Sequence, residues 1–287
     1  MSADLKSLMH PSDPTVAYLT GQLHPSQGPL LEAFAAESDA TLEVCAPTLD
    51  MPYGEHPRAV FDFYRSVLPW RGTLAYLHAG FWQARDKAHF RFLAPAFLAA
   101  GVDVVLINYP LCPDVSLRDL VDTVRRGLPR ILAFLREQSR GGEQMVVAGH
   151  SAGGHIAVEL ALTDWRAAAH VPSPIAGIVP ISGIYDLAPL RDTRLNDKLL
   201  LDAAEAQAMS PLHRVADVLP PAHFIVGGLE TPAFRAQTEA MHAAWLAGNG
   251  ASALQQVEDA NHFSVLRALA LDGAAFATVM RLFEAAG

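Results

Sequence analysis

The sequence QMVVAGHSAGGHIAVELALTDW, residues 144–165, joins an apolar run to a helix-like segment through a serine between glycines. Residues 144–149 predict a buried strand, and residues 152–165 have apolar side chains at helical spacing. Between them, Gly149-His150-Ser151-Ala152-Gly153 matches G-x-S-x-G in the strand, turn and helix context that holds a nucleophile above a sheet. Glycines two residues to either side leave room for the strained turn that this geometry requires. The stretch therefore predicts Ser151 as a catalytic nucleophile.

Strand and helix signals alternate along the remainder of the chain. Six other short apolar runs are bounded by Gly, Pro or Asp and predict strands at residues 41–46, 73–77, 102–108, 175–181, 222–227 and 253–257. Segments with apolar residues three and four positions apart predict helices at residues 87–100, 117–138, 152–165, 232–248 and 263–286. Such alternation is typical of an α/β protein with a mostly parallel central sheet and helices on both faces.

Length and composition favour a single domain. The chain has 287 residues, of which 51% are hydrophobic, so it can bury a large core. Residues 186–214 interrupt the alternation with two short helical patches and predict a small cap over the strand ends. Residues 1–40 carry the weakest pattern and predict an irregular N-terminal segment with short helices.

Charge and composition also exclude several classes of function. The net charge is −9 and no basic run occurs, which argues against a nucleic-acid partner. The chain has neither a signal-peptide pattern at its start nor the roughly 18 consecutive apolar residues of a membrane span, so we expect a cytoplasmic protein without a membrane partner. Cys45 and Cys112 form no disulfide framework, and no metal-ligand spacing occurs, so no metal or other cofactor is expected. The expected partner is a small-molecule substrate, and the sequence also allows a homodimer.

A serine nucleophile needs a base and an orienting acid. His262, one of 12 histidines, follows the last strand-like run and precedes the final helix-like segment, which makes it the predicted base. Glu230 follows the preceding run and is the predicted acid, because a carboxylate there reaches the far nitrogen of the imidazole and stabilises the imidazolium. Asp186, after the run at 175–181, is the alternative acid.

The loop His78-Ala79-Gly80-Phe81-Trp82 provides the remaining part of such a site, the oxyanion hole. Backbone N–H groups of Ala79 and Gly80 would join that of Ala152 around the oxyanion, since small residues allow a close backbone approach. His78 is expected to fix this loop through hydrogen bonds. Three aromatic residues near the strand ends are candidates either for substrate binding or for core packing: Phe81, Trp82 and Tyr185.

Further motifs follow one another in a specific order: HAGFWQ at 78–83, DK at 86–87, FLAP at 92–95, NYPLCP at 108–113, ISGIYDL at 181–187, ETP at 230–232 with Gln237, and HFSV at 262–265. Together with GHSAG at 149–153, they resemble the arylformamidase (kynurenine formamidase) branch of the α/β-hydrolase superfamily, from about Tyr53 to the end. The usual HGGYW of that family is HAGFW here, so Ala79 adds a methyl group and Phe81 lacks a phenol. The acid, usually Asp, is Glu230.

The resemblance implies an α/β-hydrolase fold and acyl transfer through Ser151, with His262 as base. The expected substrate is then an aryl amide or ester with a small acyl group, in particular N-formylkynurenine or a similar aryl formamide. A small-acyl carboxylesterase is the nearest alternative, because the same groups hydrolyse small esters. A ligand-binding protein of the same fold without turnover is a third hypothesis, and the presence of all three triad residues argues against it.

Overall fold

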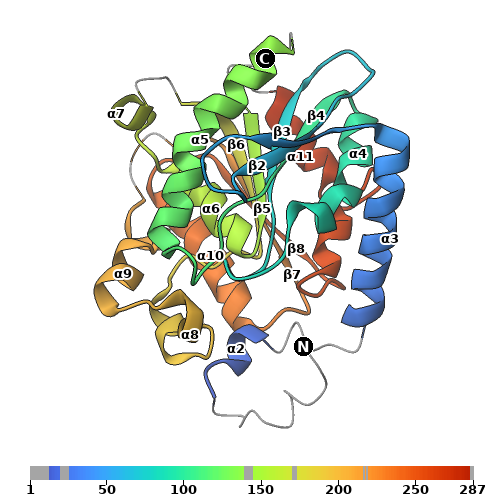
Figure 1. Cartoon of the computed structure of the whole chain (residues 1–287). Helices are drawn as coiled ribbons and strands as arrows, with labels where there is room; N and C mark the ends of the chain where they lie inside the picture. Colours follow the sequence, from blue (N-terminus) through green and yellow to red (C-terminus); the bar gives the residue numbers. More distant parts are fainter. Residues whose placement is uncertain are drawn as a thin grey trace.

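The computed structural model describes residues 13–19, 26–138, 145–169, 173–215, 217 and 219–284. Its centre is an eight-stranded sheet in the order β1-β2-β4-β3-β5-β6-β7-β8 (Figure 1). The strands β3 to β8 are parallel, whereas β2 runs antiparallel to both β1 and β4. The strands are β1 (Thr48–Pro52), β2 (Val60–Tyr64), β3 (Gly72–Leu77), β4 (Val102–Ile107), β5 (Met145–His150), β6 (Ile175–Ile181), β7 (Ala222–Gly227) and β8 (Ser252–Val257). The predicted α/β fold with a mostly parallel sheet is confirmed.

Helices cover both faces of the sheet (Figure 1). One face carries α5 (Leu117–Glu137), α6 (Ala152–Ala161) and α10 (Pro232–Ala247). The other carries α3 (Gln27–Cys45), α4 (Ala94–Leu98) and α11 (Phe276–Glu284), together with the 3-10 helices η2 (Lys87–Leu93) and η5 (Ser264–Leu269). Shorter elements are α2 (Val16–Leu19), α7 (Trp165–Ala169), η3 (Ala188–Asp192), α8 (Asn196–Leu199), α9 (Ala203–Ala208) and η4 (Pro211–His213).

The two cores follow from the alternation of side chains along the strands. In β4, Val104 and Leu106 pack into the core beneath α3 and α11, whereas Val105 and Ile107 pack into the core beneath α5 and α6. All residues of β4 are buried, as expected for a central parallel strand that is covered on both faces. The sequence of β4 is therefore uniformly apolar except for Asp103.

Two predictions for the N-terminal part were wrong. The expected strand at 41–46 forms the end of α3 instead, and residues 27–40, expected to be irregular, form the rest of that helix. Phe34, Ser38 and Thr41 are its buried residues, and their spacing of four and three fits a helical face; the Phe34 ring stacks on Phe92 of η2 at 4.0 Å. Packing thus decides the structure of a segment whose local pattern is weak. The antiparallel strands β1 and β2 were not predicted.

The other predicted elements are present, and the strands at 175–181 and 222–227 have the predicted ends. The expected helices at 87–100 and 263–286 each divide into two shorter elements, whereas the one expected at 152–165 ends at Ala161. Residues 139–144, 170–172 and 285–287 lie outside the described residues, as do 1–12 and 20–25, so the predictions that fall on them stay untested. None of the helices in the described ranges is long and apolar enough to cross a membrane.

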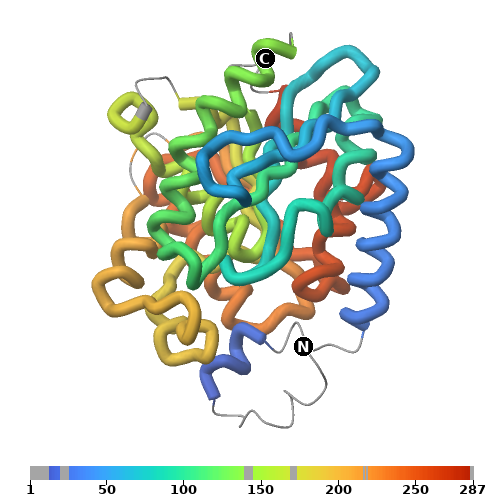
Figure 2. The backbone as a smooth tube through the Cα atoms, viewed as in Figure 1, coloured from blue at the N-terminus to red at the C-terminus, as the bar shows by residue number. Residues whose placement is uncertain are grey.

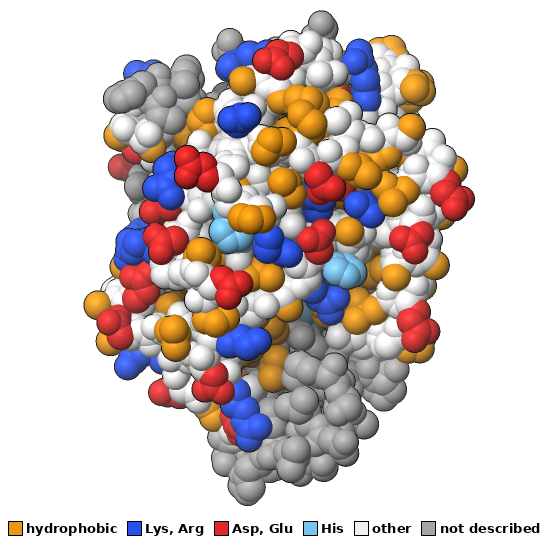
Figure 3. Space-filling view, viewed as in Figure 1, with side chains coloured by type: hydrophobic (Ala, Val, Ile, Leu, Met, Phe, Trp, Pro, Cys, Tyr) orange, Lys and Arg blue, Asp and Glu red, His pale blue; other side chains and the backbone are white. Residues whose placement is uncertain are grey.

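The predicted cap at 186–214 consists of η3, α8, α9 and η4, which connect β6 to the approach to β7. The short helix α2 lies beside this cap at one end of the molecule (Figure 2), and the hydroxyl of Thr15 accepts a hydrogen bond from the backbone N–H of Arg194 at 3.0 Å. On the face that Figure 3 shows, acidic and basic side chains are interspersed with hydrophobic ones.

Candidate active site

Five of the strands deliver the residues of the candidate site at one edge of the sheet. Neighbouring parallel strands end on the same side, and the ends of β3, β5, β6, β7 and β8 lead directly into His78, Ser151, Ser182, Glu230 and His262 or the short turns that carry them. Ligands of open α/β sheets bind outside the carboxyl ends of the strands. The topology therefore gathers residues that lie as far apart as 78 and 262 in the sequence.

Ser151 occupies the sharp turn between β5 and α6. Its backbone has φ 55° and ψ −116°, outside the regions that a serine ordinarily adopts. Its N–H donates to the carbonyl oxygen of Ile181 at 2.8 Å, and its own carbonyl oxygen accepts from His155 N–H, so both sides of the turn are fixed. The strained elbow that the sequence predicted is present.

The glycines around Ser151 permit close backbone packing, as the sequence predicted. A Cβ atom on Gly149 would lie 2.1 Å from the carbonyl oxygen of Gly153. A Cβ atom on Gly153 would lie 2.0 Å from the carbonyl oxygen of Leu77 and 2.8 Å from that of His78. Any side chain at Gly153 would therefore separate the start of α6 from the loop after β3, which carries Ala79 and Gly80.

Glu230 and His262 form a buried hydrogen-bonded pair. The Nδ1 atom of His262 lies 2.6 Å from Oε2 of Glu230, and both side chains are almost completely enclosed. Because a carboxylate accepts, Nδ1 carries the proton and Nε2 is left as the basic nitrogen. Nε2 is buried and has no hydrogen-bond partner among the described residues. Hydrogen bonds of unliganded active sites often close only when substrate is bound.

A second layer of hydrogen bonds holds the Glu230 carboxylate. Its Oε1 atom accepts from the hydroxyl of Ser182 at 2.5 Å and from the N–H of Gly227 at 2.7 Å. Sequence reasoning missed Ser182, although it lies in the ISGIYDL motif directly after β6. The alternative acid, Asp186, does not reach His262: its Oδ1 accepts from Ala188 N–H and lies 3.6 Å from Nε2 of His213.

Asn261 shapes the turn that carries His262. Its side-chain oxygen accepts from the N–H groups of Phe263 and Ser264, and its own N–H donates to the hydroxyl of Ser264. This Asx turn fixes the backbone on both sides of His262. The rings of His150 and Phe234 lie 4.7 and 4.3 Å from the imidazole of His262. Burial, reinforced by the proximity of His262, places the pKa of His150 well below its usual range.

The loop after β3 is strained where it approaches the elbow. Gly80 has φ 139°, and a Cβ atom there would lie 2.0 Å from the carbonyl oxygen of Ala84, so only glycine fits. Phe81, Trp82 and Arg85 have φ values of 50°, 59° and 74°, which non-glycine residues rarely adopt. Three such residues in one short loop require strong support from their surroundings.

A buried polar network provides that support. The His78 ring contacts the carbonyl oxygen of Ala79 through Nδ1 at 2.8 Å and Oδ1 of Asn108 through Nε2 at 2.9 Å. Asn108 also donates to Asp86 at 2.7 Å, and Arg58 donates both to Asn108 and to the carbonyl oxygen of Arg85. The structure therefore confirms that His78 fixes the loop through hydrogen bonds. Burial lowers the pKa of His78 to about 4.

The three aromatic candidates occupy different environments. Phe81 retains 7% of its surface, whereas Trp82 and Tyr185 are fully buried. The Trp82 ring meets His155 edge-on at 5.1 Å, and Tyr185 lies beneath Gly183, where an added Cβ atom would be 2.3 Å from its hydroxyl. As they lie here, Trp82 and Tyr185 belong to the core, and Phe81 alone keeps a surface that a ligand could contact.

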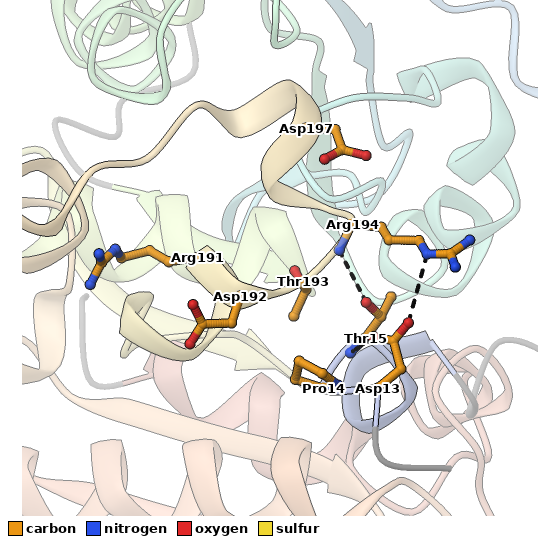
Figure 4. Close-up of a pocket in the computed structure, with 8 residues that line it drawn as sticks. All are labelled: Asp13, Pro14, Thr15, Arg191, Asp192, Thr193, Arg194 and Asp197. Atoms are coloured by element: carbon orange, nitrogen blue, oxygen red, sulfur yellow. Dashed lines mark hydrogen bonds and ion pairs between the residues drawn. The ribbon is translucent and has the colours of Figure 1, made fainter. Parts of the chain in front are cut away.

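Two cavities lie apart from the candidate catalytic residues. A polar cavity of about 430 Å³ lies where the N-terminal segment meets the cap (Figure 4). Its lining residues are Asp13, Pro14, Thr15, Arg191, Asp192, Thr193, Arg194 and Asp197. An apolar cavity of about 300 Å³ lies between η2, α4 and η5. Within the described ranges, no three His, Cys, Asp or Glu residues are grouped so that they could hold a metal ion.

Comparison with known proteins agrees with this arrangement. The sequence pattern of the alpha/beta hydrolase fold matches residues 74–266, so the class that fold and site define is the α/β-hydrolase family of enzymes. The chain is 30% identical over 240 residues to the kynurenine formamidase of Salmo salar, covering 78% of this chain and 77% of that protein. It is 28% identical over 246 residues to the kynurenine formamidase of Danio rerio, covering 83% and 82%. The chain belongs to the kynurenine formamidase branch of that family.

A solved structure shows the same fold over nearly the whole chain. The crystal structure of a protein from Silicibacter sp. TM1040, provisionally described as a thioesterase, superposes with a TM-score of 0.80 at 27% identity. The match covers 93% of this chain and 97% of that one. The same fold therefore occurs in a relative whose name refers to the cleavage of thioesters.

Proposed function

We propose that the chain is a serine hydrolase that removes a small acyl group from an aryl amide, with an aryl formamide such as N-formylkynurenine as its substrate. The observation that carries this proposal is the buried hydrogen bond of 2.6 Å between His262 and Glu230, at the sheet edge where Ser151 occupies a strained elbow. This is the combination of base, orienting acid and nucleophile that acyl transfer requires.

The mechanism proceeds in two steps. The Ser151 hydroxyl attacks the formyl carbon and transfers its proton to Nε2 of His262, while Glu230 stabilises the imidazolium through Nδ1. His262 then protonates the nitrogen of the departing aromatic amine, which leaves a formyl ester on Ser151. Water, deprotonated by the same imidazole, attacks that ester and releases formate.

The oxyanion of each tetrahedral intermediate is stabilised by backbone N–H groups. We assign these to Ala79, Gly80 and Ala152. The contact between Gly153 and the carbonyl oxygens of Leu77 and His78 supports this assignment, because it keeps the loop and the first turn of α6 together. Donors fixed in this way need no reorganisation when the negative charge develops, which is the main source of such stabilisation.

The enclosure of the nucleophile supports a small acyl group. Ser151 and His262 each expose only 1% of their surface, so little space is open around the carbonyl carbon under attack. A formyl group is the smallest acyl group, and an aromatic amine departs more readily than an alkyl amine. The names of the relatives from Salmo salar and Danio rerio point to the same substrate.

The test is a comparison of kcat/KM for N-formylkynurenine, formanilide, and the acetyl, butyryl and octanoyl esters of one phenol. We expect cleavage of both formamides and a steep fall along the ester series, because a small pocket discriminates by about 1–3 kcal/mol for each added methylene. A preference for octanoyl esters would reject the small acyl site. Good ester turnover without formamide cleavage would support the alternative, a small-acyl carboxylesterase, which the likeness to a protein described as a thioesterase favours.

A further inference from the structure

Arg85 differs from the other partly buried cations in the described part of the chain. The others donate to a carboxylate or a carbonyl oxygen: Arg58, Lys87, Arg91, Arg125 and Arg235. In the described ranges, the Arg85 guanidinium has neither an ion-pair partner nor a hydrogen-bond acceptor, and its observed partner is the ring of Phe263, 4.6 Å from Cζ. Half-buried cations without a carboxylate are uncommon, since desolvation without pairing costs free energy.

The backbone of Arg85 is held in place independently of its side chain. Its carbonyl oxygen accepts from Arg58 at 2.8 Å, and its φ is 74°. The network that fixes the loop after β3 therefore also fixes the origin of this side chain. A strained position of this kind, with an unpaired cation, is more consistent with a binding role than with a contribution to stability.

The guanidinium lies next to the candidate catalytic residues. Phe263, beneath it, immediately follows His262, and the two rings are 5.4 Å apart. The same ring is 5.3 Å from His150, the neighbour of Ser151. A single aromatic ring thus separates the cation from the imidazole. Burial lowers the pKa of Arg85, as expected for a cation that lacks a compensating anion.

We propose that Arg85 binds the carboxylate of the substrate's leaving group and so selects aryl formamides that carry an amino-acid side chain. This inference rests on the proposed function, because kynurenine is an aromatic amine with a carboxylate at the far end of its side chain. A guanidinium pairs with a carboxylate through two parallel hydrogen bonds. The partial burial of Arg85 makes that pair stronger than an exposed one.

The experiment compares N-formylkynurenine with 2-formamidoacetophenone, which keeps the formamide, the ring and the ketone but lacks the amino acid. Wild type should prefer N-formylkynurenine. Arg85→Gln should lower kcat/KM for N-formylkynurenine about tenfold or more, the loss expected for one charge-assisted pair, mainly by raising KM. It should leave 2-formamidoacetophenone unchanged, and Arg85→Lys should keep part of the preference. Arg191→Gln, at an exposed arginine of the cap, is the matched control.

Each other outcome overturns the inference in a recognisable way. Equal losses on both formamides would show that Arg85 only supports the loop, and no loss on either would show that it binds nothing. Turnover of phenyl acetate at the wild-type rate by Arg85→Gln confirms that the variant is folded. If wild type cleaves phenyl acetate but neither formamide, the proposed function fails and this inference with it. If wild type cleaves both formamides equally well and Arg85→Gln does the same, only the inference fails.

Discussion

The ring of Phe234 lies 4.3 Å from the imidazole of His262, tilted by 39°. Phe234 stands in the first turn of α10, two residues after Pro232, and is almost completely buried. Tyr18 of α2 also meets this ring edge-on at 5.9 Å. Because Glu230 holds only one edge of the imidazole, Phe234 is a second constraint on the plane of that ring.

Phe234 is therefore expected to act as a positioning residue for the base. Phe234→Leu should lower kcat about tenfold, a change in barrier of about 1.4 kcal/mol, with little change in KM. Phe234→Met should lose less, because its longer, flexible thioether can still contact the imidazole. A fall in thermal stability without a change in kcat would show that the ring only fills the core. Circular dichroism of each variant provides the control for folding.

The assignment of Ser151 predicts a specific chemical modification. Ser151→Ala should lower kcat by about 10³-fold or more with the fold intact, since removing a triad nucleophile costs most of the catalytic power. An organophosphate should inactivate the wild type and leave its phosphoryl group on Ser151 in the peptide mass spectrum. An adduct on Ser182, the serine whose hydroxyl donates to Glu230, would instead identify Ser182 as the nucleophile.

The hydrogen bond between Glu230 and His262 predicts that Glu230, and not Asp186, is the acid that supports catalysis. Glu230→Gln should reduce kcat by about 10⁴-fold, because an amide neither holds the tautomer with Nδ1 protonated nor stabilises the imidazolium. Asp186→Asn should stay close to wild type, since its carboxylate contacts Ala188 and His213 rather than His262. Steady-state rates with one substrate decide between them, and a reversed order would restore Asp186 as the acid.

The elements that position the site could be predicted from sequence because they are governed by local pattern. The strands at 145–150, 222–227 and 252–257 were predicted with ends that differ by at most one residue, and they lead into Ser151, Glu230 and His262 respectively. The choice between Glu230 and Asp186 depended on the reach of side chains across β6 and β7. Sequence reasoning could favour Glu230, and the structure shows that Glu230 is the carboxylate that contacts His262.

The residues that sequence reasoning missed act through contacts without a local signature. Ser182 donates to a carboxylate 48 positions away, and Phe234 packs on a ring 28 positions away. The motif that contains Ser182 does not indicate which carboxylate this serine contacts, and nothing in the neighbours of Phe234 distinguishes it from an ordinary core residue. The helix at 27–45 was missed for a related reason, since its apolar face is defined by η2, against which Phe34 packs.

Buried neutral histidines predict that stability falls in acid. Burial lowers the pKa of both His78 and His155 to about 4, from about 6.5 in an unfolded chain. Below pH 6.5 the unfolded chain therefore binds protons that the folded protein does not, and the free energy of unfolding falls as the pH drops from about 6.5 to about 4. The protein is therefore more stable at neutral pH. Each of these histidines lowers the free energy of unfolding by a few kcal/mol as the pH drops through this window.

His155, whose side chain is not one of the candidate catalytic groups, allows this prediction to be tested. Its Nε2 contacts the carbonyl oxygen of Met209 at 2.9 Å, and a glutamine amide can donate to the same oxygen without titrating. Urea unfolding at several pH values between 4 and 7 should show a smaller loss of stability on acidification for His155→Gln than for wild type. The neighbouring Glu159 also titrates differently in the folded protein: it lies 3.7 Å from His155, and burial raises the pKa of the Glu159 carboxyl. This shift makes the folded protein more stable in acid, because a carboxyl whose pKa is raised on folding binds its proton preferentially in the folded protein. Glu159 is present in both proteins, so the difference between them reports His155, and parallel pH profiles would contradict the prediction.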